Sequence, residues 1–220
     1  MVLKKSLGVT AMAIMLFSMV ACSKDDDQTP TFTADPGQSM TVGAVTWASR
    51  NVDAVNTFAG AADMYTSFYQ FNRNVAWPAS GTVTGWNETI IEDLNWTPAN
   101  NPCPTGWRLP TRIELTALDA LGSTWVEAYA RGNAVAGRYY GPNHATCSLT
   151  GDMTGCIFLP AAGLRSSNGV FGSQGVRARF WSSRQSHPTT GYNMMFTSTE
   201  STPDLAAGVK ALGLSVRCVR

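Results

Sequence analysis

The cysteines constrain this chain more than any other residue type. Five occur among the 220 residues, so at least one of them has no disulfide partner within the chain. Cys22 stands apart, because it directly follows an apolar stretch near the N-terminus. The other four are spread over the rest of the chain, at positions 103, 147, 156 and 218. The two groups therefore predict different roles.

The N-terminal stretch predicts an export signal over residues 1–21. Lys4 and Lys5 precede an uncharged apolar run that ends just before Cys22. The run has about 15 residues, fewer than the roughly 20 that cross a bilayer as a helix, and this is typical of a secretory signal peptide. Residues 19–22, Met-Val-Ala-Cys, resemble the bacterial lipobox, in which the cysteine is acylated and becomes the first mature residue, although methionine replaces the usual leucine.

An acylated Cys22 would anchor the chain, because each methylene buried in a bilayer contributes about 0.8 kcal/mol. The alternative is a plain signal peptide followed by an incidental cysteine.

Residues 22–39 then form a polar tether that begins with a Lys-Asp-Asp-Asp run. This run resembles the export signal of Bacteroidetes-type surface lipoproteins and implies an outer-membrane lipoprotein that faces outward. The alternative is a charge run that only keeps the tether soluble.

The charge balance argues against nucleic acid as a partner. Sixteen Lys and Arg residues against 15 Asp and Glu leave a formal charge of +1, so no broad basic field is present to release counterions. With 44% hydrophobic residues and only 14% charged ones, the chain has enough apolar surface for one sizeable core. We place that folded unit at residues 40–220.

Short extended segments separated by glycine turns dominate the folded part. Strands are predicted at the apolar or alternating runs 41–47, 67–71, 157–159, 179–183, 192–196 and 214–218. The last of these alternates in polarity, which predicts a half-buried strand. One helix is predicted over residues 112–121, because Thr111 and Glu114 have the spacing of a capping box and an apolar stripe starts at Ile113.

A second, shorter helix is predicted over residues 125–130, since Thr124 and Glu127 repeat the capping spacing. Beyond it we expect only strands and loops. Strands at both ends with helices between them predict an α+β fold of short mixed or antiparallel strands, one or two helices, and paired terminal strands.

The four later cysteines are an even set in an exported chain, where disulfides persist. Three pairings are possible, and sequence alone does not choose among them. The short, turn-rich segment between Cys147 and Cys156 favours that pair, which leaves Cys103 with Cys218. Zinc is the rival interpretation. The chain has no Cys-x-x-Cys pair and its two histidines are not spaced as ligands, so no metal site is predicted.

Six motifs, taken in chain order, resemble the Fibrobacter succinogenes major paralogous domain family. They are Val-Thr-Trp at 45–47 with Arg-Asn at 50–51, Phe-Tyr-Gln-Phe-Asn-Arg at 68–73, Cys-Pro-Thr-Gly-Trp-Arg-Leu-Pro-Thr at 103–111, Phe-Leu-Pro-Ala-Ala-Gly at 158–163, Phe-Trp-Ser-Ser at 180–183 and Ser-Val-Arg-Cys-Val-Arg at 215–220. The resemblance covers nearly all of residues 40–220 and implies a fold similar to C-type-lectin-like domains. The motif residues are expected to be scaffold, with Trp107 and Trp181 in the core.

The same resemblance places a ligand surface in the late loops, at residues 164–205. Arginine and tyrosine commonly anchor interfaces, while asparagine supplies adaptable hydrogen bonds. The ligand-binding candidates in this region are Arg165, Arg177, Arg179, Arg184, His187, Tyr192 and Asn193. For each of them the alternative is an ordinary solvated surface residue.

Calcium-dependent sugar binding and catalysis are not predicted. From residue 154 onward the only acidic residues are Glu200 and Asp204, whereas calcium needs six to eight oxygen ligands. The Arg-Leu-Pro-Thr start of the helix also resembles that of formylglycine-generating enzymes. Those enzymes use a cysteine pair, and a structural disulfide between Cys103 and Cys218 would leave none free. We therefore expect no enzyme activity, catalytic residue or cofactor.

We expect a cell-surface lipoprotein that is anchored in the membrane by its lipid. Its expected function is to bind an unknown protein or glycan, as in adhesion. One alternative is a structural component of the envelope or of fimbriae that docks to a protein partner. Another is a displayed variable protein of a diversity-generating retroelement, because lectin-like domains of this kind are targets of codon randomisation in their C-terminal part.

Overall fold

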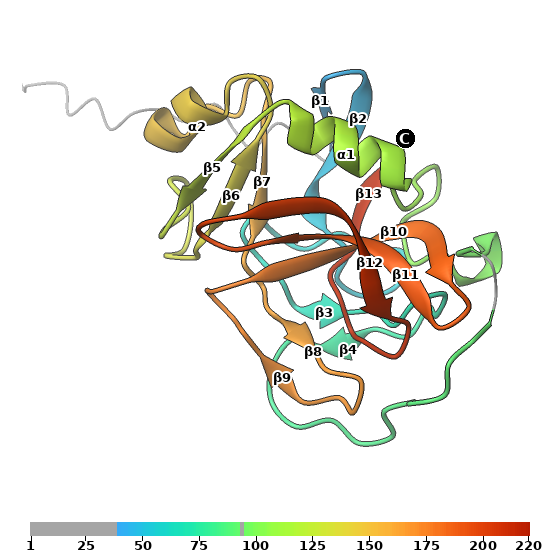
Figure 1. The fold of residues 1–220 in the computed structure, drawn as a ribbon. Coiled ribbons are helices and arrows are strands. Elements are labelled where there is room, and N and C mark those ends of the chain that lie inside the picture. Colours follow the sequence, from blue (N-terminus) through green and yellow to red (C-terminus); the bar gives the residue numbers. More distant parts are fainter. Residues whose placement is uncertain (1–38, 93–94) are drawn as a thin grey trace, which may run out of the picture. The chain divides into compact units, whose positions relative to one another are not determined.

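The computed structural model describes residues 39–92 and 95–220 (Figure 1). The predicted signal peptide, Cys22 and the tether up to residue 38 lie outside the described residues. Among the residues that the structure describes, no helix has the length and apolar character that crossing a membrane requires.

The two ends of the described chain meet in one antiparallel sheet. Three strands form it in the order β1-β2-β13, namely β1 (Ser39–Val42), β2 (Val45–Asn51) and β13 (Arg217–Val219). The predicted pairing of the terminal segments is therefore confirmed, with the last strand bonded to β2 rather than to β1. The prediction of a half-buried last strand is wrong, because Arg217 is also buried. Its guanidinium donates to the carbonyl oxygens of Ala48 and Phe158 and to Asn51 Oδ1, so the buried donors are satisfied.

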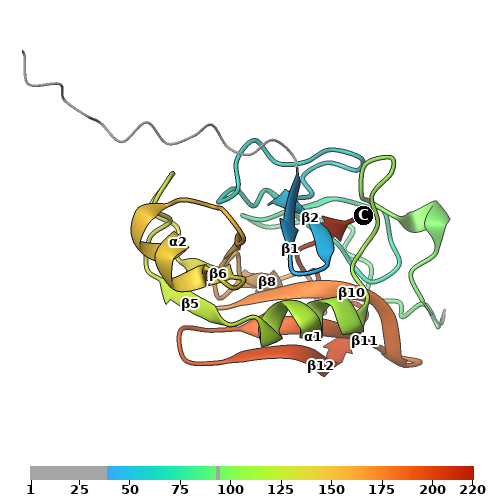
Figure 2. The ribbon, with the colours of Figure 1, turned by 90° about the horizontal axis from the view of Figure 1, so that it is seen from above.

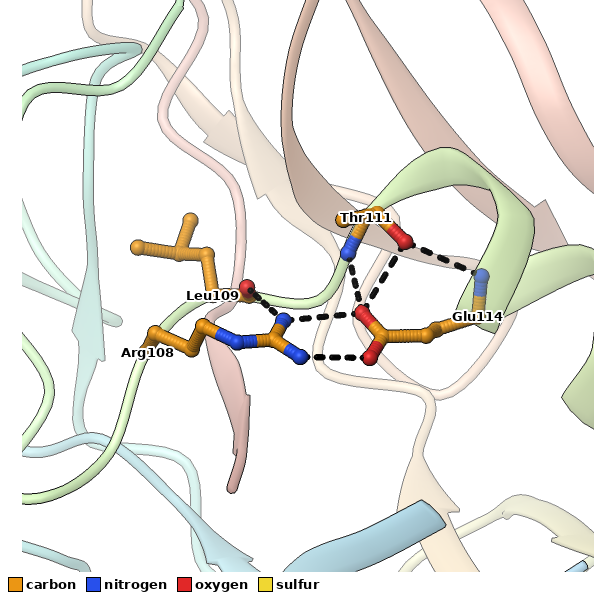
Figure 3. A network of polar contacts seen from close by, with 4 residues as sticks. All are labelled: Arg108, Leu109, Thr111 and Glu114. Carbon is orange, nitrogen blue, oxygen red and sulfur yellow. Dashed lines mark hydrogen bonds and ion pairs between the residues drawn. The ribbon is translucent and has the colours of Figure 1, made fainter. Parts of the chain in front are cut away.

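The helix α1 (Arg112–Ala120) begins at the predicted capping box (Figure 3). The Glu114 amide donates to Thr111 Oγ1 over 3.2 Å, and the Thr111 amide donates to Glu114 Oε2 over 2.7 Å. Arg108 donates to the two carboxylate oxygens of Glu114 over 2.9 and 2.6 Å. The start of α1 is thereby fixed to the segment that precedes it.

A second antiparallel sheet carries α1 on one face (Figure 2). Its strands, in the order β10-β11-β12, are β10 (Ala178–His187), β11 (Thr190–Phe196) and β12 (Ser201–Val209). Leu115 and Leu118 of α1 are buried in the core that includes Phe180 and Met194 of this sheet. Ile113, which was expected in the same apolar stripe, is instead 77% exposed.

The predicted helix over residues 125–130 is wrong. This segment enters a third sheet, in the order β5-β6-β7, whose strands are β5 (Ser123–Val126), β6 (Gly137–Tyr140) and β7 (Ile157–Pro160). Thr124 Oγ1 forms a hydrogen bond with His144 Nδ1, and the Glu127 carboxylate accepts a hydrogen bond from Trp125 Nε1. Both presumed capping side chains therefore have other partners.

A short helix lies where only strands and loops were predicted, α2 (His144–Thr150). Its N-cap residue is Asn143, a preferred residue type at this position, but the Asn143 side chain makes no capping hydrogen bond and its Nδ2 donates to the Thr154 carbonyl instead. Gly151 ends it at φ 70°, and the disulfide Cys147–Cys156 ties it to the start of β7. The second disulfide joins Cys103 to Cys218, so both predicted pairings are confirmed.

Two small hairpins and a 3-10 helix complete the described elements. These are β3 (Ser67–Phe68) with β4 (Trp77–Pro78), β8 (Leu164–Arg165) with β9 (Phe171–Gly172), and η1 (Pro98–Asn100). The predicted strand at 67–71 is therefore shorter, and continues only as an isolated bridge between Tyr69 and Leu214. Trp107 and Trp181 are buried, as predicted. The strands and two α-helices confirm the α+β class.

Candidate ligand site

The region 164–205 consists mainly of strands rather than of long loops, and this decides where its polar residues lie. β10 and β11 form a hairpin with a turn of two residues at 188–189. Successive side chains of a strand point to opposite faces. The seven candidates therefore do not form one surface, and the structure separates them into four places.

Arg184 and Tyr192 lie together in a hollow of about 470 Å³ beside the start of α1. We call it the hairpin hollow. Its described lining residues come from α1, β10, β11 and the segment before α1, and they are Asn95, Thr111, Arg112, Ile113, Arg184, Gln185 and Tyr192. The hollow combines a tyrosine, an exposed isoleucine and several hydrogen-bond donors.

Arg112 holds the Tyr192 ring in the hairpin hollow. Its guanidinium carbon lies 4.8 Å from the ring centroid, and its Nη1 donates to the Tyr192 hydroxyl over 3.2 Å. The interpretation from sequence missed Arg112, which lies outside the late region. One signal could have found it: a cation at the first position of a helix opposes the helix dipole, and such a local conflict is typical of a functional position.

The opposite rim of the hairpin hollow is fixed by a buried lysine. Lys210 is 2% exposed, and its Nζ donates to Gln185 Oε1 over 2.6 Å and to the Ile91 carbonyl over 2.8 Å. An isolated bridge pairs Asn95 with Arg184. The side chain of Gln185 and the segment around Asn95 are thus held in place by the fold.

Arg177, Arg179 and Asn193 lie in a second place, away from the Tyr192 side of the hairpin. Arg179 Nε donates to Asn193 Oδ1 over 2.8 Å, and Arg177 Nη2 donates to Ser173 Oγ over 3.0 Å. Burial, together with the neighbouring positive charge of Arg177, lowers the pKa of Arg179 to about 10. Asn193 itself is fully buried, so its prediction as a ligand contact is wrong, and it positions Arg179 instead.

Arg165 occupies a third place and is also fully buried, so its prediction as a ligand contact is wrong. Within the described residues, its guanidinium donates hydrogen bonds to four backbone carbonyl oxygens, at 2.6 to 2.9 Å. The acceptors are those of Pro78, Ser80, Gly81 and Gly169. We call this arrangement the loop clamp, because it joins the chain after β4 to the turn between β8 and β9.

The two joined loops border a smaller hollow of about 330 Å³. It is lined by Gly81, Thr82, Val83, Asn168, Gly169, Val170 and Phe171. None of these side chains carries a charge. Arg165 therefore shapes the surface indirectly, through the backbone that it holds.

His187 occupies the fourth place, at the exposed end of β10. Its Nδ1 lies 3.3 Å from Thr189 Oγ1, within the hairpin turn. Among the described residues, no hydrogen bond or ring contact joins the His187 side chain to the other candidates. In the described part of the chain, no group of three or more His, Cys, Asp or Glu side chains is arranged to hold a metal ion.

The sequence model of the Fibrobacter succinogenes major domain matches residues 40–220. The chain therefore belongs to this family, as the six motifs predicted. Neither the curated proteins nor the solved structures contained a match.

Proposed function

We propose that this chain is a lipid-anchored binding module of the cell surface, and that the hairpin hollow is its ligand site. The observation that carries the proposal is the Arg112–Tyr192 pair, a half-exposed aromatic ring fixed by a guanidinium that is itself placed at the start of a helix. Fixing a ring before binding reduces the entropy that a ligand must offset.

The chemistry of the hairpin hollow suits a protein or glycan ligand. The Tyr192 ring offers an apolar face, while Arg184 and Gln185 bring polar groups to the same depression. Tyrosine and arginine are the side chains that most often carry binding energy at interfaces. The proposal includes no catalytic step, metal or cofactor, and no nucleic acid.

The remainder of the proposal rests on the sequence. The signal peptide, the acylated Cys22 and the Lys-Asp-Asp-Asp run support an outer-membrane lipoprotein whose folded domain faces outward. The family resemblance supports a relationship of this fold to C-type-lectin-like domains. Replacing Cys22 with alanine should release the chain from the membrane fraction, and protease added to intact cells should reach the folded domain or its tether.

The ligand site is tested with the full chain in detergent micelles, on a glycan array and on intact bacterial cells. Tyr192→Ala and Arg112→Ala should each weaken binding by about tenfold or more, the effect of losing one well-placed interface anchor. His187→Ala is the matched control, because it alters the same hairpin outside the hollow. Binding that survives both hollow variants would refute this site.

Two other outcomes point to different functions. Crosslinking in intact cells that yields one reproducible protein partner, with no soluble ligand, would favour a structural component of the envelope or of fimbriae. Related strains that differ only within about residues 165–205 would favour a displayed variable protein. In the second case the variation should fall on the hollow residues of β10 and β11.

A further inference from the structure

Arg177 and Arg179, the arginine pair, are close enough for the charge of Arg177 to act on Arg179. They are two positions apart in an extended segment, so their side chains leave it on the same side. Among the residues that the structure describes, neither arginine forms an ion pair with a carboxylate. Two like charges that are partly withdrawn from water destabilise a fold when nothing compensates them.

The hydrogen bonds of the arginine pair are incomplete. Arg179 donates through Nε to Asn193, and its two terminal nitrogens have no acceptor in the described chain. Arg177 donates through Nη2 to Ser173, while its Nε is buried without an acceptor among the described residues. By contrast, the buried Arg165 donates through all three of its guanidinium nitrogens to carbonyl oxygens.

The positions of the two guanidinium groups are nevertheless well defined. Asn193 is fully buried and holds Arg179 through its Oδ1. Ser173, which holds Arg177, has a left-handed backbone conformation with φ 64°. This conformation is uncommon for residues other than glycine and is frequent at functional positions. The donors are thus oriented before any ligand arrives.

We propose that Arg177 and Arg179 form a second binding site, which takes an oxyanion: a carboxylate, sulfate or phosphate group. A planar guanidinium presents a fork of N–H donors that matches two oxygens of such a group. An oxyanion would neutralise the repulsion between the two cations and accept the hydrogen bonds that the fold leaves unmade. The site can hold the charged group of a larger ligand or a free anion.

This site is independent of the hairpin hollow. Asn193, which orients Arg179, and Tyr192 are adjacent in β11, so their side chains leave the strand on opposite faces. A ligand at the arginine pair therefore does not contact Tyr192, and each site can fail its own test without affecting the other.

The test measures thermal unfolding of the full chain in detergent micelles. Sodium sulfate, phosphate or acetate is titrated at millimolar concentration against chloride, at constant ionic strength so that general screening stays the same. We expect at least one oxyanion to raise Tm in a saturable manner. The order of the three anions identifies which charged group the site prefers.

The variants separate a binding role from a structural one. Arg177→Gln should leave Tm in chloride unchanged or raised, because it removes the repulsion, and should weaken oxyanion binding by about tenfold or more. Arg179→Gln should give the same loss of binding. Arg220→Gln, at the exposed C-terminal residue, is the control and should keep the anion-dependent rise in Tm.

Two results would overturn the proposal. One is that no oxyanion raises the Tm of the parent chain beyond the effect of chloride. The other is that Arg177→Gln and Arg179→Gln respond to the anion as the parent does. If Arg179→Gln fails to fold, the anion response of Arg177→Gln alone tests the proposal. This variant should fold, because it removes only the hydrogen bond from Arg177 to Ser173 in the turn before β10.

Discussion

Two regions of this protein use the same residue type in opposite ways. In the loop clamp, Arg165 directs its nitrogens at four backbone carbonyl oxygens and is fully buried. On the β10–β11 hairpin, Arg179 makes one side-chain hydrogen bond and lies next to a second cation. The first arrangement stabilises the fold, whereas the second leaves donors for something outside it. The number of satisfied donors, rather than the residue type, separates scaffold from candidate site.

The largest effect on stability is expected from the disulfides of the scaffold. Replacing Cys103 and Cys218 by alanine should lower the free energy of unfolding by about 4–5 kcal/mol, because the bond closes a long loop in the unfolded chain. Replacing Cys147 and Cys156 should cost about 2–3 kcal/mol, because their loop is short. Urea unfolding of both double variants gives the two values. An equal loss would contradict the chain-entropy explanation.

Arg165 is the next largest contribution on the scaffold side. Arg165→Ala should lower the free energy of unfolding by about 3–4 kcal/mol, because it removes four hydrogen bonds and leaves a cavity in place of a fully buried side chain. Arg165→Lys should recover only part of this, since an ammonium cannot reach all four oxygens in the guanidinium geometry. Urea unfolding is the measurement, with Arg177→Gln, at the residue before β10, as the matched arginine control. A loss as small as that of the control would remove the distinction between the two regions.

The cap of α1 connects the scaffold with the hairpin hollow, and its contribution depends on pH. Burial raises the pKa of Glu114, but hydrogen bonds from Arg108 and Thr111 outweigh it, so the pKa lies below its usual value. A carboxyl group whose pKa is lowered by folding stabilises the fold at a pH above its pKa in the unfolded chain. This stabilisation is lost as the pH falls through the pKa of the folded chain. Glu114→Gln should therefore cost about 1 kcal/mol at pH 7.

The acid range provides the check on this cap. Urea unfolding at pH 7 and near pH 3 should show the difference between the parent chain and Glu114→Gln shrinking at the lower pH, since protonation then removes the same charge from the parent. A difference that is the same at both values would mean that Glu114 acts through packing and not through its carboxylate.

A small effect on stability is expected in the hairpin hollow. Tyr192→Ala should lower the free energy of unfolding by less than about 1 kcal/mol, because the ring is half-exposed and outside the core clusters. Its effect on ligand binding should exceed its effect on stability. A stability loss comparable to that of Arg165→Ala would place Tyr192 with the scaffold.

Local signals were sufficient for some elements and misleading for others. The capping box of α1 was predicted from Thr111 and Glu114, because both hydrogen bonds lie within one turn of the chain. The same spacing at Thr124 and Glu127 predicted a helix that does not form. Pairing of that segment with β6 and the contact of Thr124 with His144 outweigh the local preference.

The candidate site was predicted only in part, for a related reason. The sequence drew attention to the arginines of residues 164–205, and two of the candidates, Arg184 and Tyr192, do line one hollow. It did not indicate that Arg165 would find carbonyl acceptors, since three of the four come from the distant residues 78–81. Nor did it bring Arg112 beside Tyr192, because the two lie 80 positions apart in the chain.

The sequence by itself determined the family, the α+β class and the pairing of the terminal segments, and it favoured both disulfides that the structure contains. These follow from motifs, from periodicity and from an even set of cysteines, all of which can be recognised along the chain. Only the tertiary structure decided which arginines are scaffold and which present donors outward. The physical reason is that a buried guanidinium is satisfied by oxygens from other segments, and their positions exist only once the chain has folded.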